Sequence, residues 1–454
     1  MTPRRASAPL ILALAMAAPA GVRPAAAWQA PMQPPAAAAP APMPTDTGSV
    51  PAGARPQPGV PFDPVAATRA YLATVPAAER ARSDAYFEGG YWIEFWNVLI
   101  IAGVCLLLLG YGWSRAMYAR AERLGRWPAL ATWLYWAQFL TVFTLLTLPW
   151  TAYTDWVRER QYGLANQDLA HWLLDQAKAY ALGLVLTGLA LVVLYAVIRR
   201  AGRRWAGWAS LVAVVLLAVN LMIAPVFITP VFNKVQRLTD ARIRDPIVQL
   251  AAANGVTARD IYVIDASRQS TRISANVSGF LGTERVTLND NLLHRATLPE
   301  IRAVMAHELG HYVLHHVWYL LLFFAVLFTL TLFAVRWAFE RLHRRFGKAW
   351  GVRDIADPAA LPLVFALLTV FLFVLGPVSR TATRTTEDAA DIFGLNAARE
   401  PDGFAQVALK LREYRKLDPT PVEEALFYDH PSGRARILMA MRWKAAHLGE
   451  PLPK

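Results

Sequence analysis

Apolar residues in this chain gather into long runs that polar stretches separate. Each run holds about 20 residues, the length that an α-helix needs to cross roughly 30 Å of hydrocarbon. Trp113, Trp127 and Trp205 stand at the ends of such runs, where amphipathic rings favour the headgroup zone of a bilayer. The pattern therefore predicts a mostly α-helical membrane bundle with six spans, at residues 91–113, 127–153, 178–198, 205–231, 317–338 and 360–378.

Two long polar regions interrupt this pattern. Residues 232–316 contain short β-type runs at Ile261–Ile264 and Arg285–Leu288, and residues 379–454 are polar and mostly helix-like. A two-span membrane hairpin, residues 317–378, separates the two regions. They are predicted to be the aqueous parts of the protein, with a small β-sheet, beside an N-terminal membrane domain of four spans at residues 65–231.

The N-terminus carries a different pattern. Residues 1–27 are typical of a secretory signal peptide, with a basic start at Arg4 and Arg5, an apolar stretch and three alanines at the end. The alternative is an uncleaved helix, which would add a seventh span. Residues 28–64 are rich in Ala and Pro, and such a segment is predicted to be a disordered linker because it buries too little apolar surface to offset its chain entropy.

Composition and charge agree with a membrane protein. The chain is 55% hydrophobic and only 17% charged, whereas soluble domains carry about 25% charged residues. A soluble globular enzyme, a disordered chain and a disulfide scaffold are thereby excluded, and the single cysteine, Cys105, permits no intrachain disulfide. The net charge of +13 does not indicate nucleic-acid binding, because the basic residues cluster beside the apolar runs, where they act as orientation signals.

The basic residues predict the orientation of the spans. Fourteen of them follow the first, third and fifth spans, whereas six occupy the short segments on the opposite face. The positive-inside rule places the richer face in the cytoplasm. Both aqueous regions are then predicted to lie in the periplasm of a bacterial inner-membrane protein, in agreement with an exported N-terminus.

The sharpest chemical signal is the run from Ala306 to His311, which reads Ala-His-Glu-Leu-Gly-His. Residues four apart in a helix lie on one face, so His307 and His311 can bind one Zn²⁺ while Glu308 stays within reach of the attacking water. Thr297 and Glu300 form a capping box that starts this helix. His315 and His316 follow the motif at the start of the fifth span, where an interfacial role is favoured.

A catalytic zinc site has three protein ligands and an open position, so a third ligand must come from elsewhere in the chain. Glu387 is the best candidate, and Asp391, one helical turn later, is placed to orient His307 or His311 from outside the metal's ligand shell. On spacing alone, a solvated acidic helix face is an equally good interpretation of these two carboxylates.

The order of these motifs resembles the membrane metallopeptidases of the M48 group, specifically the Ste24-type CAAX prenyl proteases. The zinc helix, two spans and then Glu387 and Asp391 carry this resemblance. Further segments that resemble the family are Leu148-Pro149-Trp150 with Tyr153, Glu159, Gly163 and Asn166, the run Ile223–Phe227, and His430-Pro431 with Arg436-Ile437. Together they cover about residues 90–445.

The resemblance implies a gluzincin-like protease domain with one Zn²⁺ per chain. His307, His311 and Glu387 would be the metal ligands, and Glu308 the general base. Asn276 would lie on an edge strand that pairs with the peptide substrate, although by itself this stretch reads equally as a short polar strand or loop. His430 and Arg436 would face the oxyanion or the substrate backbone, although the run Asp429–Gly433 alone reads as a plain turn.

The predicted function is therefore zinc-dependent hydrolysis of peptide bonds in membrane-associated or hydrophobic proteins. The resemblance implies prenyl-cysteine substrates, and quality-control cleavage of membrane or exported proteins fits the sequence equally well. One alternative is a non-catalytic membrane binding or scaffold protein that keeps the zinc site, but binding alone would not need Glu308. Another is a transporter, which the scarcity of charges within the spans disfavours.

Overall fold

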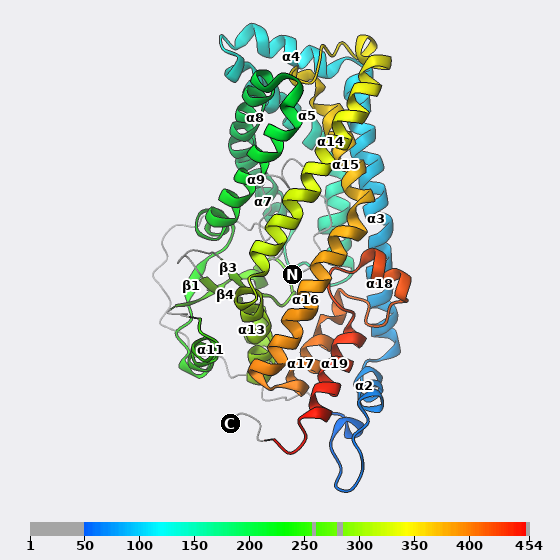
Figure 1. Ribbon diagram of the computed structural model, residues 1–454, viewed down its shortest axis with the longest axis vertical. Coiled ribbons are helices and arrows are strands. Elements are labelled where there is room, and N and C mark those ends of the chain that lie inside the picture. Colours follow the sequence, from blue (N-terminus) through cyan, green and yellow to red (C-terminus); the bar gives the residue numbers. More distant parts are fainter. Residues whose placement is uncertain (1–49, 257–259, 279–284, 451–454) are drawn as a thin grey trace.

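The structure is a computed structural model that describes residues 50–256, 260–278 and 285–450 (Figure 1). The predicted signal peptide and most of the predicted linker therefore lie outside the described residues. Long helices run along the molecule from the end that carries α4 to the end that carries the small sheet, α11, α17 and α19. The predicted fold class, a mostly helical membrane bundle with a small β-sheet, is confirmed.

The helices of the N-terminal half are α2 Pro64–Ala73, α3 Ala77–Gly110, α4 Trp113–Leu124, α5 Pro128–Ala152, α6 Arg158–Gln161, α7 Leu169–Leu182, α8 Gly188–Ala201, α9 Trp205–Ile223, α10 Thr229–Phe232 and α11 Ala241–Ala253. Those of the C-terminal half are α12 Asp290–Arg295, α13 Leu298–Val313, α14 His316–Trp350, α15 Leu361–Val374, α16 Gly376–Ala398, α17 Pro401–Lys410, α18 Pro421–Phe427 and α19 Gly433–Ala446.

By length and composition, four described helices are apolar enough to cross a membrane, or five if a pair bent by 53°, α15 with α16, counts as one span. One of the four, Leu169–Phe232, has 64 residues. At 1.5 Å per residue a straight helix of this length would be about 96 Å long, far more than one membrane crossing needs. Leu169–Phe232 folds back at Gly202, where φ is +51°, so that α8 packs against α9. This helix therefore contains both the third and the fourth predicted apolar runs.

The helix ends differ from the predicted ends of the spans. α3 begins at Ala77 rather than near residue 91, and α14 continues to Trp350 rather than ending near 338. Polar residues prolong both helices beyond the apolar runs, because a helix does not have to end where the hydrocarbon ends. Pro225 is of a residue type that kinks or ends helices, and it lies in a π-turn, Ala224–Ile228, after which the helix continues to Phe232.

A mixed sheet of four strands in the described residues packs beside α13. Its order is β1 (Val235–Arg237), β2 (Ile261–Ile264), β4 (Arg285–Asn289) and β3 (Ala275–Ser278). β2 and β4 are parallel, and β1 and β3 pair antiparallel to them at the two edges. The buried side chains of β2 and β4 pack against α11 and α13. The two predicted strands are β2 and β4, and β3 is an edge strand.

The last part of the predicted linker is packed rather than disordered. Ala52–Ala54 form a 3₁₀ turn, and Ala54 is fully buried in a cluster with Tyr71 of α2 and Ile437 of α19. The prediction of a disordered linker over 28–64 is therefore wrong for its described end. The reason is that Ala54 meets an apolar surface formed by distant residues, which local composition does not reveal.

α13 and α16 cross in unusually close contact. A Cβ on Gly394 of α16 would lie 3.0 Å from the backbone nitrogen of His307 and 3.1 Å from its Cα. On the other helix, a Cβ on Gly310 would lie 3.0 Å from the ring of Phe393 and 3.3 Å from Cα of Ala390. Since interiors are packed to crystal density, a side chain at either position would push the facing atoms back by at least a few tenths of an ångström.

We predict that Gly394→Val separates α13 from α16. Its side chain would meet backbone atoms of His307 that cannot rotate away, so the free energy of unfolding should fall by about 1–3 kcal/mol. Thermal unfolding of the detergent-solubilised protein and its zinc content, by atomic absorption, measure the two consequences, and we expect both to decrease.

Gly207→Val is the matched control, because a Cβ on exposed Gly207 of α9 has no atom within 4 Å. We expect it to unfold and to bind zinc as the wild type does. Equal behaviour of the two variants would contradict the proposed role of the glycine contact.

Candidate metal centre

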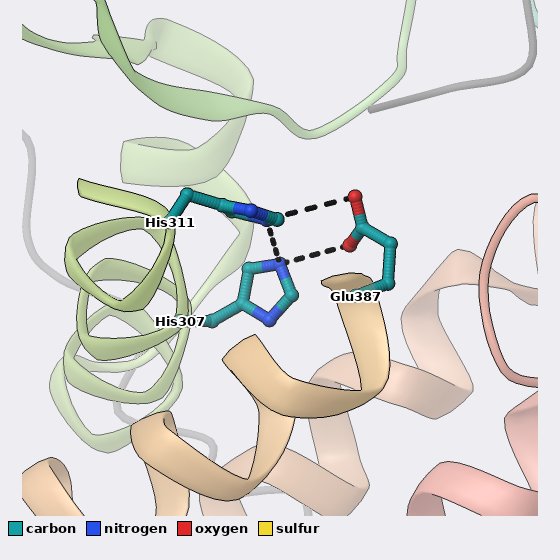
Figure 2. A group of neighbouring side chains, drawn as sticks. All are labelled: His307, His311 and Glu387. Carbon is teal, nitrogen blue, oxygen red and sulfur yellow. Dashed lines mark hydrogen bonds and ion pairs between the residues drawn. The ribbon is translucent and has the colours of Figure 1, made fainter. Parts of the chain in front are cut away.

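His307 and His311 lie one turn apart on α13, and both rings point toward α16 (Figure 2). The helix starts at the predicted cap, where the Glu300 carboxylate accepts a hydrogen bond of 2.7 Å from the backbone N–H of Thr297. Glu300 is fully buried and also binds Lys410 at 2.6 Å. This cap fixes the first turn of the helix, and the histidines follow two to three turns later.

Glu387 reaches the two histidines from α16. Its carboxylate oxygens lie 3.1 Å from Nε2 of His307 and 3.5 Å from Nε2 of His311, and the two Nε2 atoms are 3.2 Å apart. Among the described residues these three side chains form the one group of His, Cys, Asp or Glu that could hold a metal ion. Figure 2 shows the three donor groups facing a common point.

The geometry fits a metal ion. Three donors that bind one tetrahedral ion at about 2.1 Å lie about 3.4 Å from one another. The two Nε2 atoms are 3.2 Å apart, and each faces one oxygen of Glu387, His307 at 3.1 Å from Oε2 and His311 at 3.5 Å from Oε1. One donor atom from each residue lies within 4.8 Å of the other two. The donor set of two imidazole nitrogens and one carboxylate is that of several catalytic zinc sites. Only 1% of the Glu387 side chain is exposed, and a carboxylate buried to this degree needs a cation beside it.

A carboxylate and a guanidinium hold the far side of the His307 ring. Oδ1 of Asp391, which is fully buried on α16, lies 2.7 Å from Nδ1 of His307. Arg436 of α19 donates two hydrogen bonds to the same carboxylate, one of them 2.7 Å long from Nε. Burial lowers the pKa of His307, but Asp391 and Glu387 outweigh it and raise this pKa to about 9. The contact directs Nε2 of His307 toward Glu387 and His311.

The ring of His316 contacts the far side of the His311 ring, as Asp391 contacts that of His307. Its Nδ1 lies 2.9 Å from Nδ1 of His311, and its side chain is buried. The interfacial role expected for His316 is therefore wrong, because the chain turns between α13 and α14 at His315, where φ is +55°. This turn folds His316 back against the metal centre, a reversal that the i, i+4 pattern of one continuous helix does not reveal.

Glu308, the predicted general base, is half-buried and lines a cavity of about 70 Å³ together with His307. His430 lines the same cavity; its Nε2 lies 3.2 Å from Glu387 and its Nδ1 lies 2.7 Å from Asp429. Burial and the nearby Arg415 lower the pKa of His430 to about 4, so its imidazole is neutral at pH 7. Most of the other lining is apolar, from residues such as Leu292, Val304, Phe404, Val407 and Leu411.

Of the two remaining predicted site residues, Arg436 lines this cavity and Asn276 does not. Arg436 lines it while binding Asp391, so it supports His307 as well as facing the cavity. Asn276 is half-buried on edge strand β3 and does not line the cavity, although its neighbours Ser274 and Ala275 do. The structure therefore brings all the predicted site residues except Asn276 to one place.

Comparison with known proteins adds family membership to this geometry. The family model described as "Peptidase family M48" matches residues 237–444. A second family model, "CAAX prenyl protease N-terminal, five membrane helices", matches residues 67–234. An uncharacterized metalloprotease of Bacillus subtilis is 26% identical over 304 residues, which cover 66% of this chain and 71% of the relative. CAAX prenyl protease 1 of Saccharomyces cerevisiae is 26% identical over 312 residues, which cover 65% and 68%.

A solved structure shares the fold. The crystal structure of Ste24p from S. mikatae superimposes with a TM-score of 0.68 at 21% identity, covering 81% of this chain and 89% of that one. The two family models together extend from α2 to α19. The chain therefore belongs to peptidase family M48, and it is a membrane-spanning zinc metalloendopeptidase.

Proposed function

We propose that His307, His311 and Glu387 hold one zinc ion per chain and that the enzyme hydrolyses peptide bonds of membrane-associated or hydrophobic proteins. The observation that supports this most strongly is the convergence of three donors from two helices beside a cavity lined by Glu308. A non-catalytic scaffold would need the three ligands but no carboxylate of this kind at the cavity.

The bound zinc supplies Lewis acidity, which makes water nucleophilic near neutral pH and polarises a carbonyl group. Glu308 is proposed to accept the proton of the attacking water and to return it to the leaving amine as general base and then general acid. Asp391 keeps His307 in the tautomer that offers Nε2. His316 does the same for His311.

His430 and Arg436 are proposed to contact the substrate carbonyl or backbone. Arg436 carries a fixed positive charge at the cavity wall, which favours a developing oxyanion where water is scarce. Because Nδ1 of His430 donates to the Asp429 carboxylate, Nε2 of the neutral imidazole can only accept, so it is proposed to accept a hydrogen bond from a backbone N–H of the substrate. Asn276 is proposed to belong to an edge strand on which an extended peptide pairs by β-augmentation.

Two observations support a proposed class of substrate: the names of the relatives and the apolar lining of the cavity. Several relatives are named CAAX prenyl proteases. The cavity beside Glu308 is lined mostly by apolar residues, which suits an aliphatic side chain next to the scissile bond. We therefore propose aliphatic residues at the cleavage position, in peptides that membrane association brings to the enzyme.

We expect Glu308→Gln to retain one zinc per chain and to lose about 10²–10⁴ of the cleavage rate, the usual contribution of a general base. The probes are an internally quenched peptide that ends in a prenylated Cys-aliphatic-aliphatic-X sequence and the same peptide without the prenyl group.

Glu387→Ala, in contrast, should lose the zinc itself. Full cleavage by Glu308→Gln would remove it as the base, and unchanged zinc in Glu387→Ala would remove Glu387 from the ligands.

Metal binding should release protons. Because the pKa of His307 is raised to about 9 in the metal-free protein, His307 carries a proton at pH 7 that zinc must displace. The apparent affinity should therefore rise by about tenfold per pH unit as pH approaches 9. Calorimetry in buffers of different ionisation enthalpy measures this release at pH 7, and Asp391→Asn should reduce it. Binding without proton release would contradict the assignment of His307.

The catalytic end is proposed to face the periplasm of a bacterial inner membrane. In Figure 1, α4, the turn between α8 and α9, and the far end of α14 lie opposite α13 and the sheet. The end that carries α4 also carries the basic clusters around Arg120, Arg200 and Arg344. By the positive-inside rule this basic end stays in the cytoplasm.

Cysteine labelling in intact bacterial cells tests this orientation. The native Cys105 is fully buried and gives a low background. We expect a membrane-impermeant maleimide to label Ala252→Cys, at an exposed position of α11 on the catalytic end, and to label Ala116→Cys, at an exposed position of α4, only after lysis. The reverse pattern would place the catalytic end in the cytoplasm.

A further inference from the structure

The segment after the second long helix contacts the chain that leads into edge strand β3. We name residues 158–166 the docking segment and residues 267–274 the lead-in segment. Three lining residues of the cavity, Ile273, Ser274 and Ala275, lie at the junction of the lead-in segment and β3. The docking segment contains Glu159, Gly163 and Asn166, which the catalytic centre does not use.

A buried ion pair anchors this contact. Oε2 of Glu159 lies 2.6 Å from the Arg272 guanidinium, and its Oε1 accepts a hydrogen bond of 2.6 Å from the hydroxyl of Tyr86 on α3. Arg272 also donates to that hydroxyl at 2.7 Å. Only 2% of the Glu159 side chain and 16% of the Arg272 side chain are exposed. Removing one partner would leave the other charge buried and unpaired, which is costly.

Backbone contacts continue the docking along both segments. The N–H of Asn166 donates to the carbonyl of Gln269 at 2.9 Å, and the N–H of Thr271 donates to the carbonyl of Leu164 at 3.2 Å. The side-chain amide of Asn166 donates to the carbonyl of Ser267 at 2.6 Å. Gly163, with φ of +68°, turns the chain so that its carbonyl accepts from Thr271.

The protease half holds the other side of the same segment. Asn289 donates from its side chain to the carbonyl of Arg272 at 2.7 Å and accepts from the N–H of Ser274 at 3.1 Å. Asn291 donates to the carbonyl of Ser270 at 2.6 Å. The lead-in segment is thus clamped between the two halves of the protein immediately before β3 begins.

We propose that Glu159 is a positioning residue for substrate binding. Through Arg272 and the docked backbone, it holds β3 in the place and register at which an extended peptide pairs opposite the metal centre. This inference rests on the proposed endopeptidase function and on β3 as the substrate strand. Since pairing with β3 holds the peptide equally in the ground and transition states, its disturbance should raise KM and leave kcat unchanged.

The first test is Glu159→Gln in the full-length, zinc-loaded enzyme, with the quenched peptide as the probe. We expect KM to rise about tenfold, with kcat within about twofold of the wild type and one zinc per chain. Arg272→Lys keeps a positive charge facing Glu159 and should retain part of the affinity. Asn166→Ala, which removes one docking hydrogen bond at the surface, is a milder variant in case Glu159→Gln does not fold, and it should raise KM about threefold.

Asp402→Asn is the matched control. Asp402 of α17 also binds a cation and a tyrosine hydroxyl, Lys444 at 2.7 Å and Tyr71 at 2.7 Å, and it ties α2 to α17 and α19 without touching the lead-in segment. Any general loss of stability should appear in this variant too. Its KM should stay within about twofold of the wild type.

Hydrogen–deuterium exchange of residues 267–278 gives a readout that needs no turnover. We expect faster exchange there in Glu159→Gln and unchanged exchange in Asp402→Asn. Unchanged KM and exchange in Glu159→Gln, an equal rise of KM in Asp402→Asn, or a fall of kcat alone would overturn the positioning role. If the wild type itself cleaves neither peptide, the proposed function fails, while the exchange result still decides whether the clamp orders β3.

Discussion

The close contact of α13 and α16 at Gly310 and Gly394 is the constraint on which the proposed metal centre depends. Gly394 lies two helical turns after Glu387, and it meets the backbone of His307 directly. A larger residue there would move the helices apart, whereas metal ligands must meet their ion to within about 0.2 Å. Two small residues on segments about 80 positions apart in the sequence therefore determine whether a carboxylate and two imidazoles share one ligand point.

Each buried carboxylate at the crossing of α13 and α16 is paired with basic side chains. Asp391 binds both His307 and Arg436, and Glu387 faces the two histidines of α13 and His430. Two carboxylates taken out of water cost several kcal/mol each before pairing, and a well-packed apolar crossing is often at least as stable as buried ion pairs. The burial of Glu387 and Asp391 is thus better explained by the proposed metal site than by a gain in fold stability.

The local parts of this architecture could be predicted from the sequence, and the tertiary parts could not. The spacing of His307 and His311 places them on one helix face by geometry alone, and the β-branched run at β2 predicts its strand. Glu387 was indicated chiefly by resemblance to a family, because an acidic helix face reads the same whether or not another helix crosses it. His316 was misplaced since the turn at His315 breaks the helical period, and the Glu159–Arg272 pair joins segments too far apart for any periodicity to connect.

The docking of the lead-in segment bears on how an edge strand can serve as a binding surface. An exposed edge must keep its hydrogen-bonding groups available, yet a strand held only by one neighbour is prone to shift its register. In this protein β4 pairs with one side of β3, and the contacts from Leu164, Asn166 and Asn289 fasten the residues just before it. Fixing a strand by its beginning rather than by its outer edge orders the backbone without covering the side that a peptide would use. The N-terminal membrane half is then more than an anchor, because the placement of the strand beside the metal centre depends on a carboxylate, Glu159, that this half provides.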